Sequence, residues 1–333
     1  MAENKNWGGK RENAGRKRMN VKVVSFTMEE ELLNSFSKEI NRSKLLNGCV
    51  KVSGIPLTII ETNRANAEHI KKNNPNDNYQ MNLDFDSVDE YDATKLDCWS
   101  FKTGNEVKDG IVLDLGNQCS GYPFVFHGHN FYTSESAYLC GQFSQNTDEC
   151  YRIQQKLISE KNGYRAKRYI KNYNKAQIRA DWDEVFMAEW MLYVIWCKCR
   201  GNKDFADKLK TLPRDAIIIE NSTTVHEKTS IYWGSINDEL EIVRDMAACC
   251  AEIQYQAKVW QEGTKARKRK LEEEKQAARN EIHHMGTFHS GHNYMGKILK
   301  RCQLALLDGI EPEINYDLLR EKNIYLLGEL LRF

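Results

Sequence analysis

Residues 125–135 have the sequence VFHGHNFYTSE, and the structure expected for the chain is built outward from this run. Two short segments rich in aromatic residues flank His127-Gly128-His129, a pattern that predicts a β-hairpin. Thr133 and Ser134 follow, and their hydroxyl groups are suited to cap a helix that starts at Glu135. We therefore expect a hairpin joined directly to a capped helix.

Both flanks of this run continue the mixture of strands and helices. Helical periodicity predicts four helices downstream, at residues 147–159, 163–172, 181–199 and 203–211. The third carries a stripe of large apolar side chains, namely Trp182, Val185, Phe186, Trp190, Tyr193 and Trp196. We interpret this stripe as a core face rather than a cofactor site. Upstream, short apolar runs at residues 55–60 and 111–113 predict strands.

The composition excludes several classes of protein. The chain has 333 residues and a net charge of +1, and 41% of the residues are hydrophobic, enough to build a core. No apolar run reaches the roughly 18 residues of a membrane span, and the first residues lack the apolar stretch of a secretory signal. We expect a globular, cytoplasmic protein that is neither collagen-like, transmembrane nor wholly disordered.

The ten cysteines indicate free thiols rather than a metal centre. None forms a C-x-x-C pair, although Cys197 and Cys199 are spaced C-x-C and Cys249 adjoins Cys250. The eight histidines include no H-E-x-x-H motif. Zinc sites usually combine such motifs, so the sequence predicts no metal and no cofactor.

The first 50 residues are basic and resemble a DNA-binding module. Residues 1–24 carry seven Lys and Arg side chains against two Glu. A strand is expected at residues 21–27, and two helices are expected to begin at Met28 and behind Ser43. This order resembles the ribbon-helix-helix family, in which the paired strands of two chains enter the major groove of DNA. The resemblance implies a homodimer that binds DNA through Arg16, Lys17, Arg18 and Lys22. A basic tail on an ordinary α/β segment is the alternative.

The rest of the chain divides into four expected parts. Residues 51–110 form a connector that is partly acidic. The main domain covers residues 111–310, and a C-terminal helix covers 311–333. Within the main domain, residues 236–284 combine a helical apolar pattern with a highly charged run, which predicts an inserted helical hairpin. The basic cluster Lys265–Lys270 is either simply solvated or a docking surface for a partner or nucleic acid.

Four separated groups of motifs occur in a fixed order along the main domain. They are LGN (115–117) with GYPF (121–124) and TSESAY (133–138), IRADW (178–182) with CKC (197–199), IEN (219–221) with IYWG (231–234), and GHNYMGKIL (291–299). In this order they resemble the NADAR family, also called YbiA-like, over about residues 111–307. No single motif is specific, but four groups in this order with plausible spacing are much more so.

This resemblance implies a predominantly helical α+β domain that hydrolyses N-glycosidic bonds. The family's substrates are phosphorylated intermediates of the riboflavin pathway and ADP-ribose attached to a base such as guanine. The expected ligand is therefore an ADP-ribosyl or phosphoribosyl nucleotide. Because the N-terminus resembles a DNA-binding module, removal of ADP-ribose from guanine in DNA is the leading expectation. The alternatives are an N-glycosidase acting on riboflavin-pathway or NAD-derived nucleotides, and a non-catalytic ADP-ribose sensor with a regulatory role.

Two carboxylates and a lysine are the candidate catalytic residues. Cleavage of a C1–N bond builds oxocarbenium character on the sugar, so it needs a carboxylate near C1 and a proton donor for the leaving base. Glu135 is the first candidate for general base or cation stabiliser, because the helix N-terminus stabilises its ionised form. Glu220 is the second carboxylate. A capping role for Glu135 and an ordinary strand-end position for Glu220 are the structural alternatives.

Lys198 matches a lysine of the family pattern. A lysine beside an opened ribose could form a Schiff base at C1, which makes it a candidate nucleophile. A phosphate-pairing or surface lysine is the alternative.

Further residues are expected to bind the substrate. Trp233 offers a flat face for a base or ribose, and Gly234 lets the backbone approach closely. The Gly-Asn-Gly turn before a helix is suited to a phosphate or a ribose hydroxyl. The complete set is Asn117, Tyr138, Trp182, Trp233, Gly234, Gly291, Asn293 and Gly296.

Two positions depart from the family pattern. Gln142 stands where the family usually has a lysine, and Ser230 stands where it usually has an aspartate. The first change removes a cation that could hold a phosphate, and the second removes a carboxylate. Both changes also fit a domain that binds its ligand without turning it over.

Overall fold

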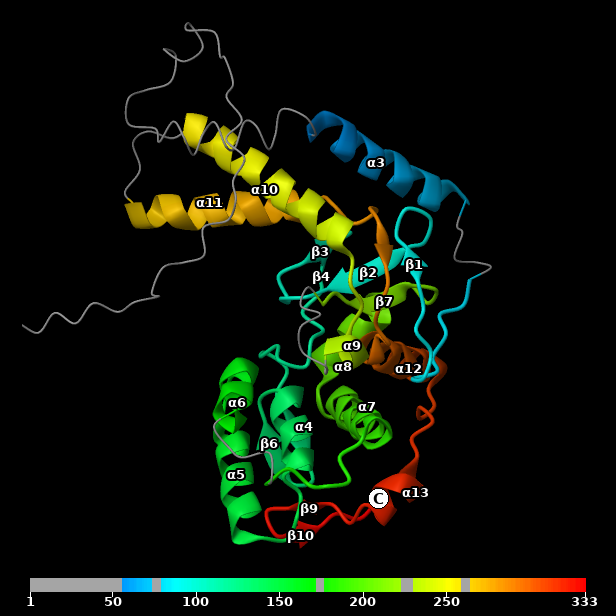
Figure 1. The fold of residues 1–333 in the computed structure, drawn as a ribbon, viewed down its shortest axis with the longest axis vertical. Helices are drawn as coiled ribbons and strands as arrows, with labels where there is room; N and C mark the ends of the chain where they lie inside the picture. Colours follow the sequence, from blue (N-terminus) through cyan, green and yellow to red (C-terminus); the bar gives the residue numbers. More distant parts are fainter. Residues whose placement is uncertain (1–55, 74–78, 172–176, 223–229, 259–263) are drawn as a thin grey trace, which may run out of the picture. The chain divides into compact units, whose positions relative to one another are not determined.

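The computed structural model describes residues 56–73, 79–171, 177–222, 230–258 and 264–333. The chain divides into two units, residues 1–46 and 47–333, and all the described residues belong to the second. The module predicted for residues 1–50, with Arg16, Lys17, Arg18 and Lys22, lies outside them. The described part is a mixture of helices and small sheets, which confirms the expected α+β class (Figure 1).

The hairpin and the capped helix expected around residues 125–135 are present. β5 (Phe124–Phe126) pairs antiparallel with β6 (His129–Phe131). His127 and Gly128 between them have φ angles of 45° and 80°, the left-handed values that a tight two-residue turn requires. α4 (Ser134–Gln142) begins behind Thr133, whose hydroxyl accepts the N–H of Ser136. Turn and cap together fix the first turn of α4, which contains Glu135.

The larger of two cores lies between α4 and α7 (Glu184–Gly201). α5 (Asp148–Ser159) and α6 (Gly163–Ile170) pack on α4. α8 (Lys203–Thr211) and α12 (Tyr294–Asp308) pack on α7.

The aromatic stripe of α7 faces this core, as expected, at Phe186 and Trp190, whereas Val185 is 59% exposed. Trp190 donates its ring N–H to the carbonyl oxygen of Tyr138 at 3.1 Å, which ties α7 to α4. The two helices are so close that a Cβ on Gly141 would lie 2.3 Å from Trp190 Nε1.

A parallel pair of buried strands connects this core to a smaller one. β2 (Cys98–Phe101) pairs with β7 (Ile217–Glu220). Ile218 packs into the larger core, while the isoleucines on either side of it face the smaller core against α10 (Asp238–Lys258). Because both faces are buried, a one-residue slip would place every side chain on the wrong side. The register therefore fixes Glu220 at the end of β7.

The helical hairpin expected at residues 236–284 is present as two helices that lie side by side, α10 and α11 (Thr264–Arg279) (Figure 1). The chain before α10 and the chain that follows α11 come together near the base of this segment. There, Ile236 and His289 form an antiparallel bridge, with both backbone hydrogen bonds at 2.9 Å.

The described residues also contain the following elements. They are α3 (Pro56–Asn73), β1 (Tyr91–Asp92) paired with β8 (Thr287–Phe288), β3 (Val107–Lys108) paired with β4 (Ile111–Val112), α9 (Ser230–Trp233), α13 (Tyr316–Glu321), and β9 (Tyr325–Leu326) paired with β10 (Glu329–Leu330). None of the helices in the described ranges is long and apolar enough to cross a membrane.

Two expectations for secondary structure are wrong. Residues 56–60 begin α3 rather than form a strand, because proline is accepted in the first turn of a helix and the polar residues that follow continue it. The C-terminal segment is helical only over α13 and then forms a hairpin. Leu327 and Gly328 have φ angles of 49° and 81°, which turn the chain back on itself.

The contact between α4 and α7 gives a first prediction. Gly141→Ala would place a methyl group inside the Trp190 ring, so we expect it to lower the free energy of unfolding by about 1–3 kcal/mol. Urea denaturation of the full chain measures this change. Gly116→Ala is the matched control, because its nearest new contact would be an ordinary 3.6 Å from Cys119 Sγ. Equal stability of the two variants would contradict the packing described here.

Candidate active site

Glu135 is a buried carboxylate held beside Asn117. It lies in the first turn of α4 and is 3% exposed. Its backbone N–H donates to the carbonyl oxygen of Asn117 at 2.8 Å, and the Asn117 side-chain N–H donates to its carboxylate. Burial raises the pKa of Glu135 to about 7, although the nearby charge of Lys167 and the bond from Asn117 oppose this rise. This carboxyl group therefore changes its charge near neutral pH.

Glu220 comes to the same place from another element. It is the last residue of β7, opposite Phe101 of β2. Burial raises its pKa to about 7, the charge of Lys167 lowers it, and the negative charge of Glu135 raises it further. The two glutamates therefore interact electrostatically, although 85 residues separate them in the sequence. The structure brings together the two carboxylates that sequence analysis proposed.

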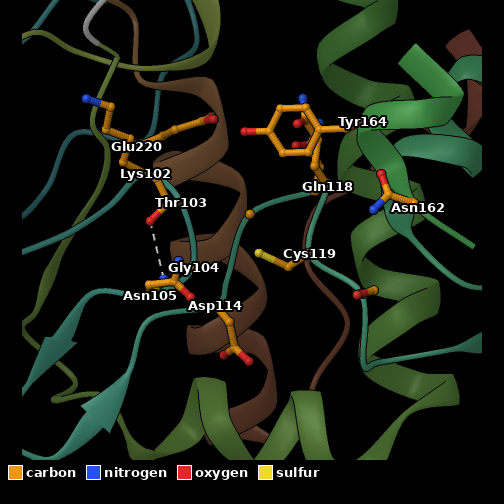
Figure 2. A pocket seen from close by; sticks show the side chains of 13 residues that line it. Lys102, Thr103, Gly104, Asn105, Asp114, Gln118, Cys119, Asn162, Tyr164 and Glu220 are labelled. Atoms are coloured by element: carbon orange, nitrogen blue, oxygen red, sulfur yellow. Dashed lines mark hydrogen bonds between the residues drawn. The ribbon is translucent and has the colours of Figure 1, made fainter. Parts of the chain in front are cut away.

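A cavity of about 430 Å³ is lined by Glu220 and by Asn117, the residue that donates to Glu135 (Figure 2). Its wall comes from the segments that follow β2 and β4 and from the start of α6. The lining residues are Lys102, Thr103, Gly104, Asn105, Asp114, Gly116, Asn117, Gln118, Cys119, Ser120, Asn162, Tyr164 and Glu220. In Figure 2 the side chains of Glu220 and Tyr164 extend toward one another from opposite sides. The cavity is thus polar, with a carboxylate on one side and a phenol on the other.

Asn293 holds the strand that presents Glu220. Its side chain is fully buried, accepts the backbone N–H of Glu220 at 3.0 Å and donates to the carbonyl oxygen of Ile218 at 2.9 Å. Its own φ angle is 52°, a left-handed value that asparagine tolerates better than most residues. Both ends of this amide contact backbone, so the geometry gives Asn293 a positioning role at Glu220. Its expected contact with substrate remains a prediction.

The three candidate glycines allow close packing behind the same strand. A Cβ on Gly234 would lie 2.4 Å from the carbonyl oxygen of Glu220. On Gly291 it would lie 1.9 Å from the carbonyl oxygen of Gly234, and on Gly296 it would lie 2.1 Å from that of Ile218. These positions bring α9 and α12 against the end of β7, and any larger residue would push them away.

The candidate aromatic residues form a cluster next to Glu135. Tyr138 contacts Trp182 and Trp233 edge-to-face, with ring centroids 5.4 Å and 5.2 Å away. Both tryptophans are half-buried, so part of each ring is open to solvent. The Tyr138 hydroxyl lies near Glu135, whose charge adds to burial in raising the Tyr138 pKa. These rings do not line the cavity of Figure 2, and within the cluster it is Tyr138 that lies near Glu135.

Lys198 is fully buried on α7. Its Nζ has no hydrogen-bond partner within the described residues and lies 3.9 Å from the centroid of the Phe205 ring. Burial lowers its pKa to about 8, against the opposing charges of Cys119 and Asp114, which line the cavity. The amine is therefore close to losing its proton near the cavity wall, as a nucleophile requires. Lys198 itself does not line the cavity.

Sequence analysis missed several residues of this site. Lys102 to Asn105 lie in a connector that showed no chemistry, and Tyr164 and Lys167 lie on a helix that looked ordinary. Lys167 is exposed, yet its charge acts on both glutamates. No spacing rule places an exposed lysine next to two carboxylates from different elements. The one signal in the sequence is the i,i+3 spacing of Tyr164 and Lys167, which predicts that they lie on the same face of a helix.

Comparison with known proteins adds no relative from which the role of this site could be transferred. No family model matches the chain, and no curated protein matches it. Within the described ranges, no group of three or more His, Cys, Asp or Glu side chains is arranged to hold a metal ion.

The arrangement is suited to proton transfer at neutral pH. Because both carboxyl groups have pKa values of about 7, one can be ionised while the other is protonated at neutral pH. Asn117 donates to Glu135 and so favours its ionised form, whereas the described residues provide no hydrogen bond to the Glu220 carboxylate. Glu135 is therefore the better base, and Glu220 the better acid.

The raised pKa of Glu135 makes the stability of the protein depend on pH. The folded state keeps a proton that the unfolded chain loses above its ordinary pKa near 4.5, so stability falls as pH rises from about 4.5 through about 7. Glu135→Gln removes this loss, so at pH 8 the variant should be more stable than the wild type by up to about 3 kcal/mol.

Urea denaturation at pH 4 and pH 8 tests this prediction. The two proteins should differ little at pH 4. Glu313→Gln, an exposed carboxylate, is the control and should change neither value by more than about 0.5 kcal/mol. A wild type that is the more stable protein at pH 8 would contradict a desolvated Glu135.

Proposed function

We propose that this protein is an N-glycosidase that hydrolyses the bond between ribose, or ADP-ribose, and a base. The observation that carries the proposal is the pair Glu135 and Glu220, whose pKa values are both raised to about 7 beside a polar cavity. Perturbed carboxyl groups of this kind are typical of catalytic acids and bases. The order of motifs that resembles the NADAR family points to the same reaction.

The proposed step uses both carboxyl groups. As the C1–N bond breaks, positive charge develops on the sugar, and ionised Glu135 stabilises it and takes a proton from the attacking water. The hydroxide oxygen bonds to C1. Protonated Glu220 gives its proton to the leaving nitrogen of the base, so the products are the free sugar and the free base. Water supplies all the added atoms, and the pair ends with its proton moved from Glu220 to Glu135.

We further propose that the substrate is ADP-ribosylated guanine in DNA. The basic residues Arg16, Lys17, Arg18 and Lys22 would bind the DNA backbone, and attachment to DNA raises the local concentration of a modified base. A homodimer follows if the N-terminus pairs its strands as ribbon-helix-helix proteins do. The cysteines in the described ranges are free thiols, which suits a reducing compartment, so we place this activity in the cytoplasm.

A binding module without turnover is the second candidate, and one observation favours it. Gln142 stands where the family pattern has a lysine, and its side-chain oxygen is buried without a hydrogen-bond partner among the described residues. A catalytic or phosphate-binding cation is therefore missing from that position. Such a module would act as an ADP-ribose sensor.

Mass spectrometry of DNA that carries ADP-ribosylated guanine tests the enzyme directly. We expect the wild type to release ADP-ribose and restore guanine, and Glu135→Gln to slow this release by 100-fold or more. Glu313→Gln should retain full activity. Saturable binding of ADP-ribose without release would favour the sensor. Activity only on riboflavin-pathway or NAD-derived nucleotides would favour a small-molecule N-glycosidase.

The DNA-binding proposal has its own test in the full-length chain. Replacing Arg16, Lys17 and Arg18 together by Gln removes three positive charges, so we expect turnover on the DNA substrate to fall at least tenfold at 150 mM salt. Turnover on a free ADP-ribosylated nucleoside should not change, because the cavity is intact. Equal loss on both substrates would show that the basic residues do not act through DNA.

A further inference from the structure

α6, whose first residues line the cavity, also carries a lysine that the proposed step does not use. Lys167 follows Tyr164 by three residues on α6, so the two side chains lie on one face of the helix. Tyr164 and Asn162 line the cavity (Figure 2). Gly163 fixes this end of α6, because a Cβ there would lie 2.6 Å from the Cα of Gln118, another residue of the wall. Lys167 itself does not line the cavity, but it lies one helical turn beyond Tyr164 on the same face of α6.

Lys167 differs from Lys102, Lys198 and Lys208 in being both exposed and without an ion pair or hydrogen bond among the described residues. Lys102 donates to Glu241 at 2.7 Å, and Lys208 forms an ion pair with Asp114. Lys198 is buried against the Phe205 ring. Lys167 is exposed and makes no ion pair or hydrogen bond within the described part of the chain. Its ammonium group is thus available to an incoming anion.

The positive charge of Lys167 also acts on the two candidate catalytic glutamates. Its positive charge reaches both Glu135 and Glu220 and lowers their pKa values against the effect of burial. A ligand with its own negative charge would be repelled by an ionised carboxylate in this cavity. An unpaired ammonium group near both carboxylates offsets that repulsion, and hydrogen-bond donors beside it can complete an anion site.

We propose that Lys167, with Tyr164 and Asn162, forms a subsite for the phosphate or diphosphate carried by the ribose of the substrate. Tyr164 supplies a hydroxyl donor and Asn162 an amide. The ammonium group binds the phosphate while the sugar C1 lies toward the two glutamates. The identity of the ligand as a ribose nucleotide rests on the proposed function; the anion subsite itself rests on the geometry of α6. The subsite makes the protein selective for phosphorylated over unphosphorylated nucleosides.

Calorimetric titration of the full chain tests this subsite without requiring turnover. The probes are ADP-ribose, ribose 5-phosphate and inorganic pyrophosphate, with guanosine as the unphosphorylated comparison. Lys167→Gln should weaken binding of ADP-ribose by 10- to 100-fold, because a charge-assisted hydrogen bond is lost, and should leave guanosine unchanged. Lys156→Gln, an exposed lysine on α5, is the matched control and should bind like the wild type. Unchanged ADP-ribose affinity in Lys167→Gln, or failure of all three phosphorylated probes to bind the wild type, would overturn the proposal.

A second readout separates this proposal from the proposed function. If hydrolysis occurs, Lys167→Gln should raise KM for phosphorylated substrates and move the acidic limb of the pH profile upward, since both carboxyl groups lose a neighbouring positive charge. Hydrolysis that keeps its KM and its pH profile in Lys167→Gln would refute the subsite and leave the enzyme standing. Binding that depends on Lys167 in a protein without hydrolysis would refute the enzyme and support the subsite.

Discussion

The buried amide of Asn293 is the contact on which the candidate site depends. β7 ends at Glu220, where a strand would leave its last backbone groups without partners. Asn293 bonds one such N–H and one carbonyl group, two residues apart, and belongs to the turn that opens α12. Gly296 then lets α12 approach the strand closely enough for these bonds to form. The helix thus sets the position of the carboxylate, although it contributes no charged group to the site.

Local signals explain which parts of the fold could be predicted from the sequence. The β5–β6 turn and the Thr133 cap depend on neighbouring residues, so their patterns suffice. β2, with the sequence CWSF, is buried on every side and shows no alternation, and α3 begins with an apolar run too short to distinguish helix from strand. Glu135 and Glu220 could be joined only through the order of distant motifs. Tyr164 and Lys167 could not be found, because α6 is positioned by its close approach to Gln118, a residue far away in the sequence.

The site also contains buried ionisable groups that lower the stability of the fold and are suited to catalysis. A carboxyl group with a pKa near 7 is destabilising at high pH, and Lys198 holds its charge poorly in the core. A protein selected for stability alone would replace such groups with apolar or paired ones. Here Asn117 and Lys167 offset only part of the penalty. The rest of the core, from Trp190 to the isoleucines of β7, supplies the stability that these groups cost.

The bridge between Ile236 and His289 lies at the base of the segment that contains α10 and α11. Because α10 also packs against β7 near this base, the length of the segment can change without moving β7 or α12 only at its far end. The entropy cost of such a change grows only slowly with loop length. The base of the hairpin therefore belongs to the core that positions Glu220, whereas its far end can lengthen or shorten among descendants of one ancestral domain.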